Sequence, residues 1–309
     1  MRVLLTGAGG FIGAQVARAL LASGAEVHAV VRDRARAPRL AAIEKELTIH
    51  EADLVDRAAA ARVIDASKPE ICVHGAWYAV PGKYLEAPEN LTHVAASLDL
   101  VQRLVHAGCT RIVGLGTCFE YDTSLGVPLV ESSPTKPRFL YAASKLALHD
   151  VLRAYAPIAK VGFAWCRIFY QYGPMEPRER LVPHVVDRLL DGGVAETTEG
   201  GQIRDFLHVA DVGAAIAAVA LSDLEGAVNV GSGVAVTVRE LVGTIARLCD
   251  AEDRVRFGAM PYRPNDPMHV CADVTRLASI GFRPRFDLER GLADTLRARR
   301  EETRRPTPP

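Results

Sequence analysis

A glycine-rich turn follows the first apolar run of this chain and limits the folds that the chain can adopt. Residues 6–13 read TGAGGFIG and place Gly7, Gly10 and Gly13 between Val3–Leu5 and a segment of helical spacing. Glycines at this spacing permit a tight turn, a close approach of backbone to a phosphate, and close packing of a helix on a strand. The N-terminus of the helix also attracts negative charge. The turn therefore predicts a site for a dinucleotide pyrophosphate, although a lone motif of this kind also fits a turn without a ligand.

Short apolar runs alternate with segments of helical spacing through the first half of the chain. The apolar runs are Val3–Leu5, Val27–Val31, Leu47–Ile49, Ile71–Val73, Arg111–Leu115 and Val161–Cys166. The helical segments are Phe11–Leu21, Arg57–Ala66, Leu91–Val105 and Tyr141–Tyr155. Strands alternating with helices predict an α/β fold, a Rossmann-like doubly wound parallel sheet with helices on both faces.

After residue 168 glycines and prolines become frequent and divide the chain into shorter segments. We predict a smaller, mixed C-terminal substrate-binding domain there. Because 210–221 is again helical and 228–230 again strand-like, the predicted dinucleotide-binding domain comprises 1–168 plus 206–230, and the substrate domain 169–205 plus 231–300. The charged, proline-rich tail at 301–309 is expected to be disordered.

Composition excludes several classes of partner. Lys plus Arg equals Asp plus Glu at 37 each, so no overall field attracts nucleic acid or an anionic membrane. The six cysteines are scattered, without a CxxC pair or the paired spacing of a metal site. No apolar run is long enough for a signal peptide or a membrane span. We therefore expect a cytoplasmic protein with no metal, and no nucleic-acid or membrane partner.

The residues after the second apolar run bear on which dinucleotide is bound. In NAD-binding folds an acidic side chain about 20 residues beyond the glycine turn accepts hydrogen bonds from the ribose, whereas the 2′-phosphate of NADP needs a cation. Here Val31 stands at the position of the acid and Arg32 follows it. Because arginine can hold a phosphate through two hydrogen bonds, we predict that NADP(H) is favoured over NAD(H). Two alternatives stay open: Asp33 could bind the ribose, and Asp53 could reach the adenine or cap the next helix.

Tyr141 and Lys145 form a Tyr-x-x-x-Lys pair at the start of a predicted helix. The spacing puts both on one face, one turn apart. An ammonium near a phenol favours the phenolate, and an oxidised nicotinamide adds a second positive charge, so a tyrosine with an ordinary pKa of about 10 can move toward neutrality. Such a tyrosine can exchange a proton with a carbonyl or hydroxyl group. An isolated pair also fits a core tyrosine and a surface lysine, but the glycine turn upstream favours the chemical interpretation.

Several further motifs follow the glycine turn in a set order. They are the strand end at 73–76, Thr117, YAASK at 141–145, RIFYQYGP at 167–174, RDFLHVAD at 204–211, NVGSG at 229–233 and RPND at 263–266. Together they resemble the extended short-chain dehydrogenase/reductase family of nucleotide-sugar epimerases, dehydratases and ketoreductases, over nearly the whole chain. The resemblance implies a nucleotide-sugar substrate. It also implies a homodimer formed through the helices near 91–105 and 141–155.

The resemblance implies that Tyr141 is the catalytic acid or base, that Lys145 holds the nicotinamide ribose and lowers the tyrosine pKa, and that Thr117 hydrogen-bonds the reacting oxygen. The arginines at 204 and 263 would lie near the nucleotide diphosphate, although either alone also fits a surface ion pair. The predicted cofactor-binding residues are Gly7, Gly10, Phe11, Ile12, Gly13, Arg32, Asp53, Leu54, Tyr141 and Lys145. The predicted substrate-binding residues are Thr117, Cys118, Gln171, Arg204 and Arg263.

Two positions depart from the family pattern. Tyr170 stands where asparagine commonly contacts the nucleotide sugar, and the neighbouring Gln171 is a candidate to replace that contact. His93 stands in the region where the family often has an asparagine, and a lone histidine is more often packed or solvated. Transfer of both asparagine contacts to this chain is therefore open.

The residues after Thr117 bear on the reaction. A 4,6-dehydratase needs an additional acid and base, and members of that kind place Asp-Glu directly after the threonine. Here Cys118 and Phe119 occupy these positions, and a phenyl ring cannot carry a proton. Strand alternation turns Glu120 away from the face of Phe119, so we expect it only to pack, and without a histidine near in sequence Cys118 is expected to be a packed thiol. Dehydration is therefore disfavoured.

The remaining hypotheses differ in the chemistry that accompanies hydride exchange. We predict an NAD(P)-dependent oxidoreductase that uses NADPH to reduce the 4-keto group of a nucleotide-activated hexose or 6-deoxyhexose, because Arg32 favours NADPH and TCFEY with the later RDF and RPND resembles such reductases. One alternative is an NAD-dependent nucleotide-sugar 4-epimerase. Another is a non-catalytic NADP-binding redox sensor, a class that commonly lacks the Tyr-Lys pair.

Overall fold

The computed structural model describes residues 1–264 and 266–304, and its largest element is a parallel sheet of seven strands. The strand order is β10-β6-β5-β4-β1-β2-β3. The strands are β1 Arg2–Thr6, β2 Glu26–Val31, β3 Thr48–Glu51, β4 Ile71–His74, β5 Arg111–Thr117, β6 Gly162–Ile168 and β10 Gly226–Val230. From β1 the chain first adds strands on one side, β2 and β3, and then on the other side, beginning with β4. This is the strand order of a doubly wound sheet, and it confirms the predicted fold class.

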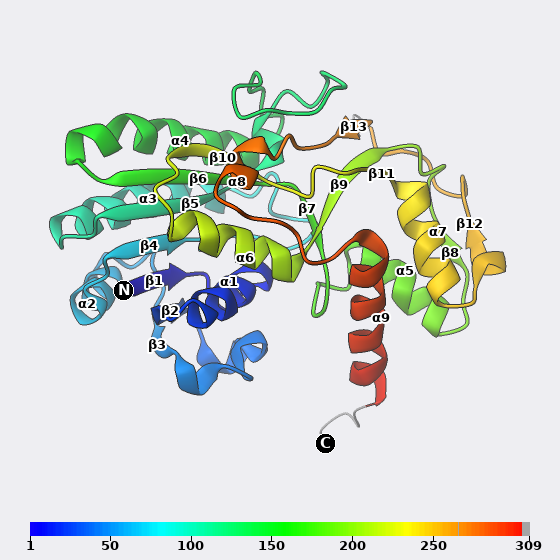
Figure 1. The fold of residues 1–309 in the computed structure, drawn as a ribbon, viewed down its shortest axis with the longest axis horizontal. Coiled ribbons are helices and arrows are strands. Elements are labelled where there is room, and N and C mark those ends of the chain that lie inside the picture. Colours follow the sequence, from blue (N-terminus) through cyan, green and yellow to red (C-terminus); the bar gives the residue numbers. More distant parts are fainter. Residues whose placement is uncertain (265, 305–309) are drawn as a thin grey trace.

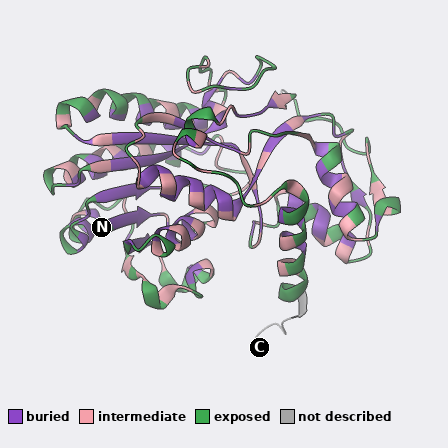
Figure 2. Ribbon diagram, viewed as in Figure 1, coloured by how far each residue is buried: buried purple, intermediate pink, exposed green. Residues whose placement is uncertain are grey.

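Helices cover both faces of this sheet (Figure 1). One face carries α1 Phe11–Ala22 and α6 Val209–Ala220, which pack on each other, and the other carries α2 Arg57–Ser67, α3 Glu89–His106 and α4 Leu140–Ala159. Figure 2 shows the central strands buried and the outer surfaces of the helices exposed, whereas the edge strand β3 is exposed or half-buried. Burial on both faces explains why the central strands are apolar runs in the sequence.

The second part of the chain forms smaller sheets and helices beside the carboxyl ends of the large sheet (Figure 1). Strand β9 Ile203–His208 pairs with β7 Tyr170–Tyr172, β11 Ala235–Thr237 and β13 His269–Val270, and β8 Ala195–Glu196 pairs with β12 Val255–Arg256. The helices are α5 Leu181–Leu190, α7 Val238–Leu248, α8 Thr275–Ser279 and α9 Leu288–Arg304. Short 3-10 helices are η1 Arg34–Arg36, η2 Pro38–Leu40, η3 Glu44–Glu46, η4 Cys118–Glu120 and η5 Glu252–Arg254.

The predicted domain boundaries agree with this arrangement in outline and stay a proposal. α6 and β10 return to the large sheet as expected, whereas the boundary at 206 falls inside β9, which begins at Ile203. Residues 301–304 end α9 and are helical, so the expected disorder is wrong there, and residues 305–309 lie outside the described part. Within residues 1–264 and 266–304, no helix combines the length and the apolar character that crossing a membrane requires.

Candidate active site

The glycine turn joins β1 to α1 at the carboxyl end of the sheet. Gly7 has φ of +71°, and a Cβ on it would lie 2.8 Å from backbone atoms of Gly75 and Ala76. A Cβ on Gly13 would overlap the carbonyl oxygen of Gly7, and one on Gly10 would lie 3.1 Å from the same oxygen. No acidic side chain stands in the first turn of α1 and none caps it. The turn therefore offers a close backbone approach and uncapped N–H groups, which fit the pyrophosphate of a dinucleotide.

The residues predicted at the adenosine end lie after β2 and β3. Arg32 is exposed at the end of β2. Asp33 caps η1 through its carboxylate, so this oxygen is already engaged locally. Asp53 accepts a hydrogen bond of 3.0 Å from the N–H of Val55, while Asp56 caps α2. Of the two roles left open for Asp53, the cap of the next helix is filled by Asp56.

Tyr141 and Lys145 lie one turn apart at the start of α4, as predicted. The Lys145 side chain is buried, and its Nζ donates a hydrogen bond of 2.8 Å to the carbonyl oxygen of Leu115. The same nitrogen lies 3.7 Å from the centroid of the Trp77 ring, in a cation–π contact. Burial lowers the pKa of Lys145 to about 7, and the charge of Glu120 acts in the opposite direction. Lys145 is therefore poised between its charged and neutral forms at neutral pH.

The phenol of Tyr141 has a raised pKa. Burial is the main cause, Tyr84 and Glu120 add to it, and Arg180 is the cation that lowers it. The Tyr84 ring meets the Tyr141 ring edge-on at 4.9 Å, and Arg180 lies 5.7 Å from the centroid of the Tyr84 ring. The Lys145 ammonium is turned to Leu115 and Trp77, and the expected lowering of the Tyr141 pKa by Lys145 stays a prediction.

Thr117 ends β5 with its side chain buried. Its N–H donates a hydrogen bond of 2.9 Å to Oε1 of Glu120, and its hydroxyl oxygen accepts one of 3.3 Å from the N–H of Phe119. This is a capping box for η4, which packs on α4. The hydroxyl hydrogen takes no part in that cap, and the Thr117 side chain also forms a hydrogen bond with the Cys118 side chain, so a substrate oxygen would compete with this thiol for the donor.

Cys118 lies in an apolar cluster with Tyr121, Leu129 and Phe169. Burial raises the pKa of its thiol to about 12, so no thiolate forms at neutral pH. The packed thiol expected from the sequence is confirmed. The predicted contact of Cys118 with substrate stays a prediction; the residue is 3% exposed, as Lys145 is.

Replacement of Cys118 by alanine tests this assignment. We expect kcat/KM to stay within about threefold of wild type, because a buried neutral thiol neither donates charge nor exchanges protons. The free energy of unfolding should fall by about 1 kcal/mol for the lost packing. A denaturant titration measures the second quantity, and a loss of activity beyond tenfold in a stably folded variant would show that the thiol has a chemical role.

The predicted substrate arginines differ in their surroundings. Arg204 is buried on β9, pairs with Asp266 at 2.9 Å and lies 5.1 Å from the Tyr170 ring centroid. Arg263 is exposed on the turn that brings Asp266 to Arg204. Gln171 alternates with Tyr170 along β7, so the two side chains point to opposite faces, and the predicted substrate contact of Gln171 stays a prediction.

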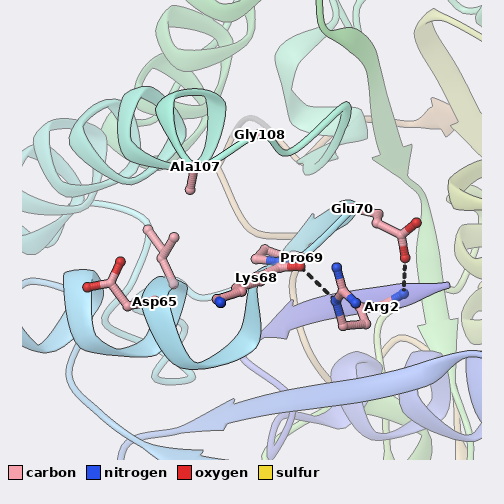
Figure 3. A pocket seen from close by; sticks show the side chains of 8 residues that line it. Arg2, Asp65, Lys68, Pro69, Glu70, Ala107 and Gly108 are labelled. Carbon is pink, nitrogen blue, oxygen red and sulfur yellow. Dashed lines mark hydrogen bonds between the residues drawn. The ribbon is translucent and has the colours of Figure 1, made fainter.

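A hollow of about 580 Å³ lies at the opposite end of the sheet (Figure 3). Arg2, Asp65, Lys68 and Glu70 line it, and the backbone N–H of Arg2 donates to Glu70 at 2.7 Å. It contains none of the predicted site residues. Ligands of doubly wound sheets bind at the carboxyl ends of the strands, so the glycine turn marks the site and this hollow does not.

Sequence reasoning missed the residues that surround the Tyr-Lys pair. Trp77 follows the strand-end motif, contacts Lys145, stacks with His93 at 5.3 Å and donates to Asn90 at 2.7 Å. His93 is therefore packed, as its commoner fate suggested. An aromatic residue directly after the 73–76 motif was the one available signal. Tyr84 and Arg180 carried none, because they reach Tyr141 from segments far away in sequence.

Comparisons with known proteins agree with this geometry. The family described as "NAD dependent epimerase/dehydratase family" matches residues 3–231. A dTDP-glucose 4,6-dehydratase of Streptomyces griseus is 28% identical, covering 95% of this chain and 92% of that protein. A UDP-glucose 4-epimerase of Mycolicibacterium smegmatis is 30% identical, covering 96% of this chain and 97% of that protein.

Two solved structures are similar over almost their full lengths. The Thermus thermophilus UDP-glucose 4-epimerase in complex with NAD has a TM-score of 0.86 at 27% identity, covering 97% of this chain and 99% of that one. The dTDP-glucose 4,6-dehydratase DesIV of Streptomyces venezuelae, with NAD and TYD bound, has a TM-score of 0.85 at 29% identity, covering 97% of each chain.

Proposed function

This chain belongs to the NAD-dependent epimerase/dehydratase family, and from that premise we propose that it is a nucleotide-sugar 4-epimerase. The observation that carries the proposal is the chemistry beside the Tyr-Lys pair. Positions 118 and 119 offer a buried thiol with a pKa raised to about 12 and a phenyl ring, neither of which can serve as a second acid or base. Epimerisation at C4 needs only one proton-exchanging group, whereas 4,6-dehydration needs more.

The residues of the site have different roles in such a reaction. A nicotinamide dinucleotide at the glycine turn supplies the hydride acceptor and donor. Tyr141 takes the proton of the sugar 4-hydroxyl and later returns it, while Thr117 donates a hydrogen bond to the same oxygen. Lys145 in its charged form stabilises the phenolate of Tyr141 when it turns toward it. Thr117 and Lys145 are buried and Tyr141 is half-buried, which limits the access of water to the reacting oxygen.

Similar proteins support the epimerase over the reductase predicted from sequence. UDP-glucose 4-epimerases recur among the relatives, and both similar structures described above bind NAD. The 4-ketoreductase remains a second candidate on one observation, Val31 followed by the exposed Arg32 in place of an acid. The complete Tyr-Lys pair speaks against the redox sensor.

Replacement of Arg32 by serine separates the two cofactor preferences. If Arg32 holds a 2′-phosphate, the variant should bind NADPH about tenfold more weakly and NADH unchanged, because a charge-assisted hydrogen bond contributes about 1.5–3 kcal/mol. Fluorescence titration with each dinucleotide measures both constants. Arg36→Ser is the matched control, since Arg36 is exposed and pairs with Asp33 at 3.3 Å. Equal weakening toward both dinucleotides would remove the basis of the NADP preference.

The proposed activity is tested with a panel of nucleotide sugars. UDP-glucose, UDP-galactose, dTDP-glucose and dTDP-rhamnose are incubated with the protein and catalytic NAD or NADP, and the products are separated by chromatography with mass detection. A C4 epimer of unchanged mass supports the proposal. Loss of water identifies a dehydratase, and stoichiometric consumption of NADPH by a 4-keto sugar identifies the reductase.

We keep the predicted homodimer as a proposal. Apolar side chains are exposed on the two helices expected at its interface, Leu91 on α3 and Val151 and Ile158 on α4. Exposed apolar side chains on these helices are available to a surface that a second subunit covers. Light scattering after size-exclusion chromatography gives the mass of the particle directly.

A further inference from the structure

Glu120 lies in η4, directly after β5, and its carboxylate has no exposed surface. Its Oε1 accepts a hydrogen bond of 2.9 Å from the N–H of Thr117 and one of 3.0 Å from the indole of Trp165. Its Oε2 accepts a hydrogen bond of 2.8 Å from Nε of Arg167. Each of these partners is a donor, and an ionised carboxylate is the form that accepts from all of them. From strand alternation we expected Glu120 only to pack. The structure shows instead that its carboxylate accepts hydrogen bonds from three residues.

The strand carrying Thr117 is shaped around this carboxylate. A Cβ on Gly114 would overlap the ring of Trp165, and one on Gly116 would overlap both the indole nitrogen and the Glu120 carboxylate. β5 and β6 run side by side in register, so Trp165 faces Gly114 across the strands. The two glycines before Thr117 are therefore needed to admit Glu120 and Trp165 beneath the site.

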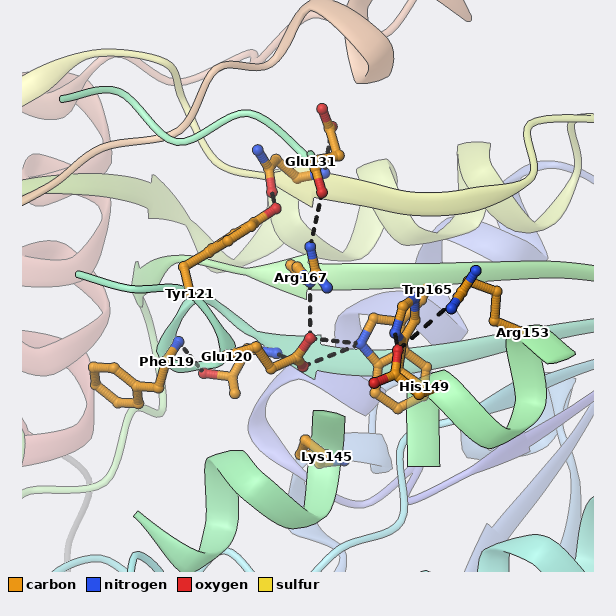
Figure 4. A network of polar contacts seen from close by, with 12 residues as sticks. Phe119, Glu120, Tyr121, Glu131, Lys145, His149, Arg153, Trp165 and Arg167 are labelled. Atoms are coloured by element: carbon orange, nitrogen blue, oxygen red, sulfur yellow. Dashed lines mark hydrogen bonds and ion pairs between the residues drawn. The ribbon is translucent and has the colours of Figure 1, made fainter. Parts of the chain in front are cut away.

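Arg167 anchors Glu120 from the other side. It is buried, its Nη1 donates a hydrogen bond of 3.1 Å to the carbonyl oxygen of Glu131, and it lies 4.5 Å from the centroid of the Tyr121 ring. Breaking a buried ion pair by removing one partner is costly, so the pair fixes the carboxylate in place. Figure 4 shows Glu120 between Arg167 and Trp165, with Lys145 of α4 on its opposite side.

We propose that Glu120 is a positioning residue of this site, which fixes Thr117 at the end of β5 and keeps the buried Lys145 ammonium charged. Its effect on catalysis rests on the proposed function, because it acts through Thr117 and Lys145. Its effect on Lys145 can be measured without any substrate. The proposal therefore stands or fails separately from the identity of the reaction.

The electrostatic part depends on the surroundings of Lys145. Burial lowers the pKa of Lys145 to about 7, and the negative charge of Glu120 raises it. Burial also raises the pKa of Glu120 itself, and Arg167 opposes this. The titratable or charged groups around the two residues are Cys118, Tyr121, Glu131, Tyr141, His149 and Arg167 near Glu120, and His74 and His93 near Lys145.

The two tryptophans of the chain make the test possible. Trp77 lies 3.7 Å from the Lys145 ammonium, and Trp165 contacts Glu120. In a Trp165→Phe background, Trp77 is the only tryptophan, so its emission reports the protonation of Lys145. We expect a transition with a midpoint near pH 7 in the apo protein. Adding Glu120→Gln should move the midpoint lower by roughly one pH unit, because it removes the negative charge that raises the pKa of Lys145.

Two further variants secure the assignment. Lys145→Met should abolish the part of the fluorescence transition that Lys145 causes. A transition that persists in this variant is assigned to His93, which stacks on Trp77. Glu120→Gln combined with Arg167→Gln removes both charges of the buried ion pair together, and it is the variant to measure if Glu120→Gln alone does not fold. Its midpoint should also lie lower, because Glu120 and not Arg167 acts on Lys145.

The proposal is overturned if a folded Glu120 variant has a midpoint within about 0.2 pH units of that of the Trp165→Phe protein. This interval is small beside the shift of roughly one pH unit that we expect. The same variants tested with an active substrate should show the alkaline limb of kcat/KM moving to lower pH by a similar shift. A uniform loss of rate at every pH, with unmoved limbs, would mean that Glu120 serves only the folding of the strand.

Discussion

Replacement of Tyr141 by phenylalanine is expected to lower kcat by about 10²- to 10⁴-fold, the range that one positioned acid or base contributes. The phenol is the group of the site that can exchange a proton with the sugar oxygen, and the phenyl ring preserves its edge-on contact with Tyr84. Dinucleotide affinity should remain within about threefold, because the glycine turn carries the pyrophosphate contacts. Steady-state kinetics and a fluorescence titration measure the two quantities.

Tyr84→Phe is the matched control for this variant. It removes a hydroxyl from the neighbouring ring and leaves the Tyr141 phenol in place, so kcat should change by less than about tenfold. If Tyr141→Phe retained more than about a tenth of the wild-type rate, Tyr141 would not be the proton-exchanging group and the mechanism proposed above would fail.

Replacement of Gly13 by alanine is expected to remove measurable dinucleotide binding and to lower the free energy of unfolding by about 1–3 kcal/mol. The added methyl would overlap the carbonyl oxygen of Gly7, so α1 must move away from the turn. Since each 1.4 kcal/mol is a factor of about ten, even a modest displacement of the N–H groups from the pyrophosphate weakens binding strongly. Denaturant unfolding and a dinucleotide titration measure the two effects.

Gly243→Ala is the matched control, because Gly243 lies inside α7 and a Cβ there would meet no other atom. This change should raise stability by about 0.5–1 kcal/mol through helix propensity and leave dinucleotide binding unaltered. Normal dinucleotide affinity in Gly13→Ala would contradict the packing role assigned to the turn.

The parts of the site that sequence could predict are those set by local spacing. The glycines at 7, 10 and 13 and the pair of Tyr141 and Lys145 depend on turn geometry and helical periodicity, and the structure places both as expected. The central strands of the sheet could also be predicted, because burial on both faces of a parallel sheet requires apolar runs.

The parts that sequence could not predict depend on contacts between distant segments. Glu120 and Arg167 are 47 positions apart and meet only because β5 and β6 are neighbours in the sheet. The direction of the Lys145 ammonium is set by Trp77 and Leu115, which no helical pattern reveals. Alternation also misled at Glu120, because the strand ends at Thr117 and a 3-10 helix follows.

The most direct test of the proposed 4-epimerisation is the fate of the hydrogen at C4. The nucleotide sugar that the panel identifies as substrate is prepared with deuterium at C4, converted in ordinary water, and examined by mass spectrometry and proton NMR. Our account predicts a C4 epimer that retains deuterium at C4, with no net change in the dinucleotide. An epimer that has exchanged its C4 deuterium for solvent hydrogen, or a product that has lost water, would contradict it.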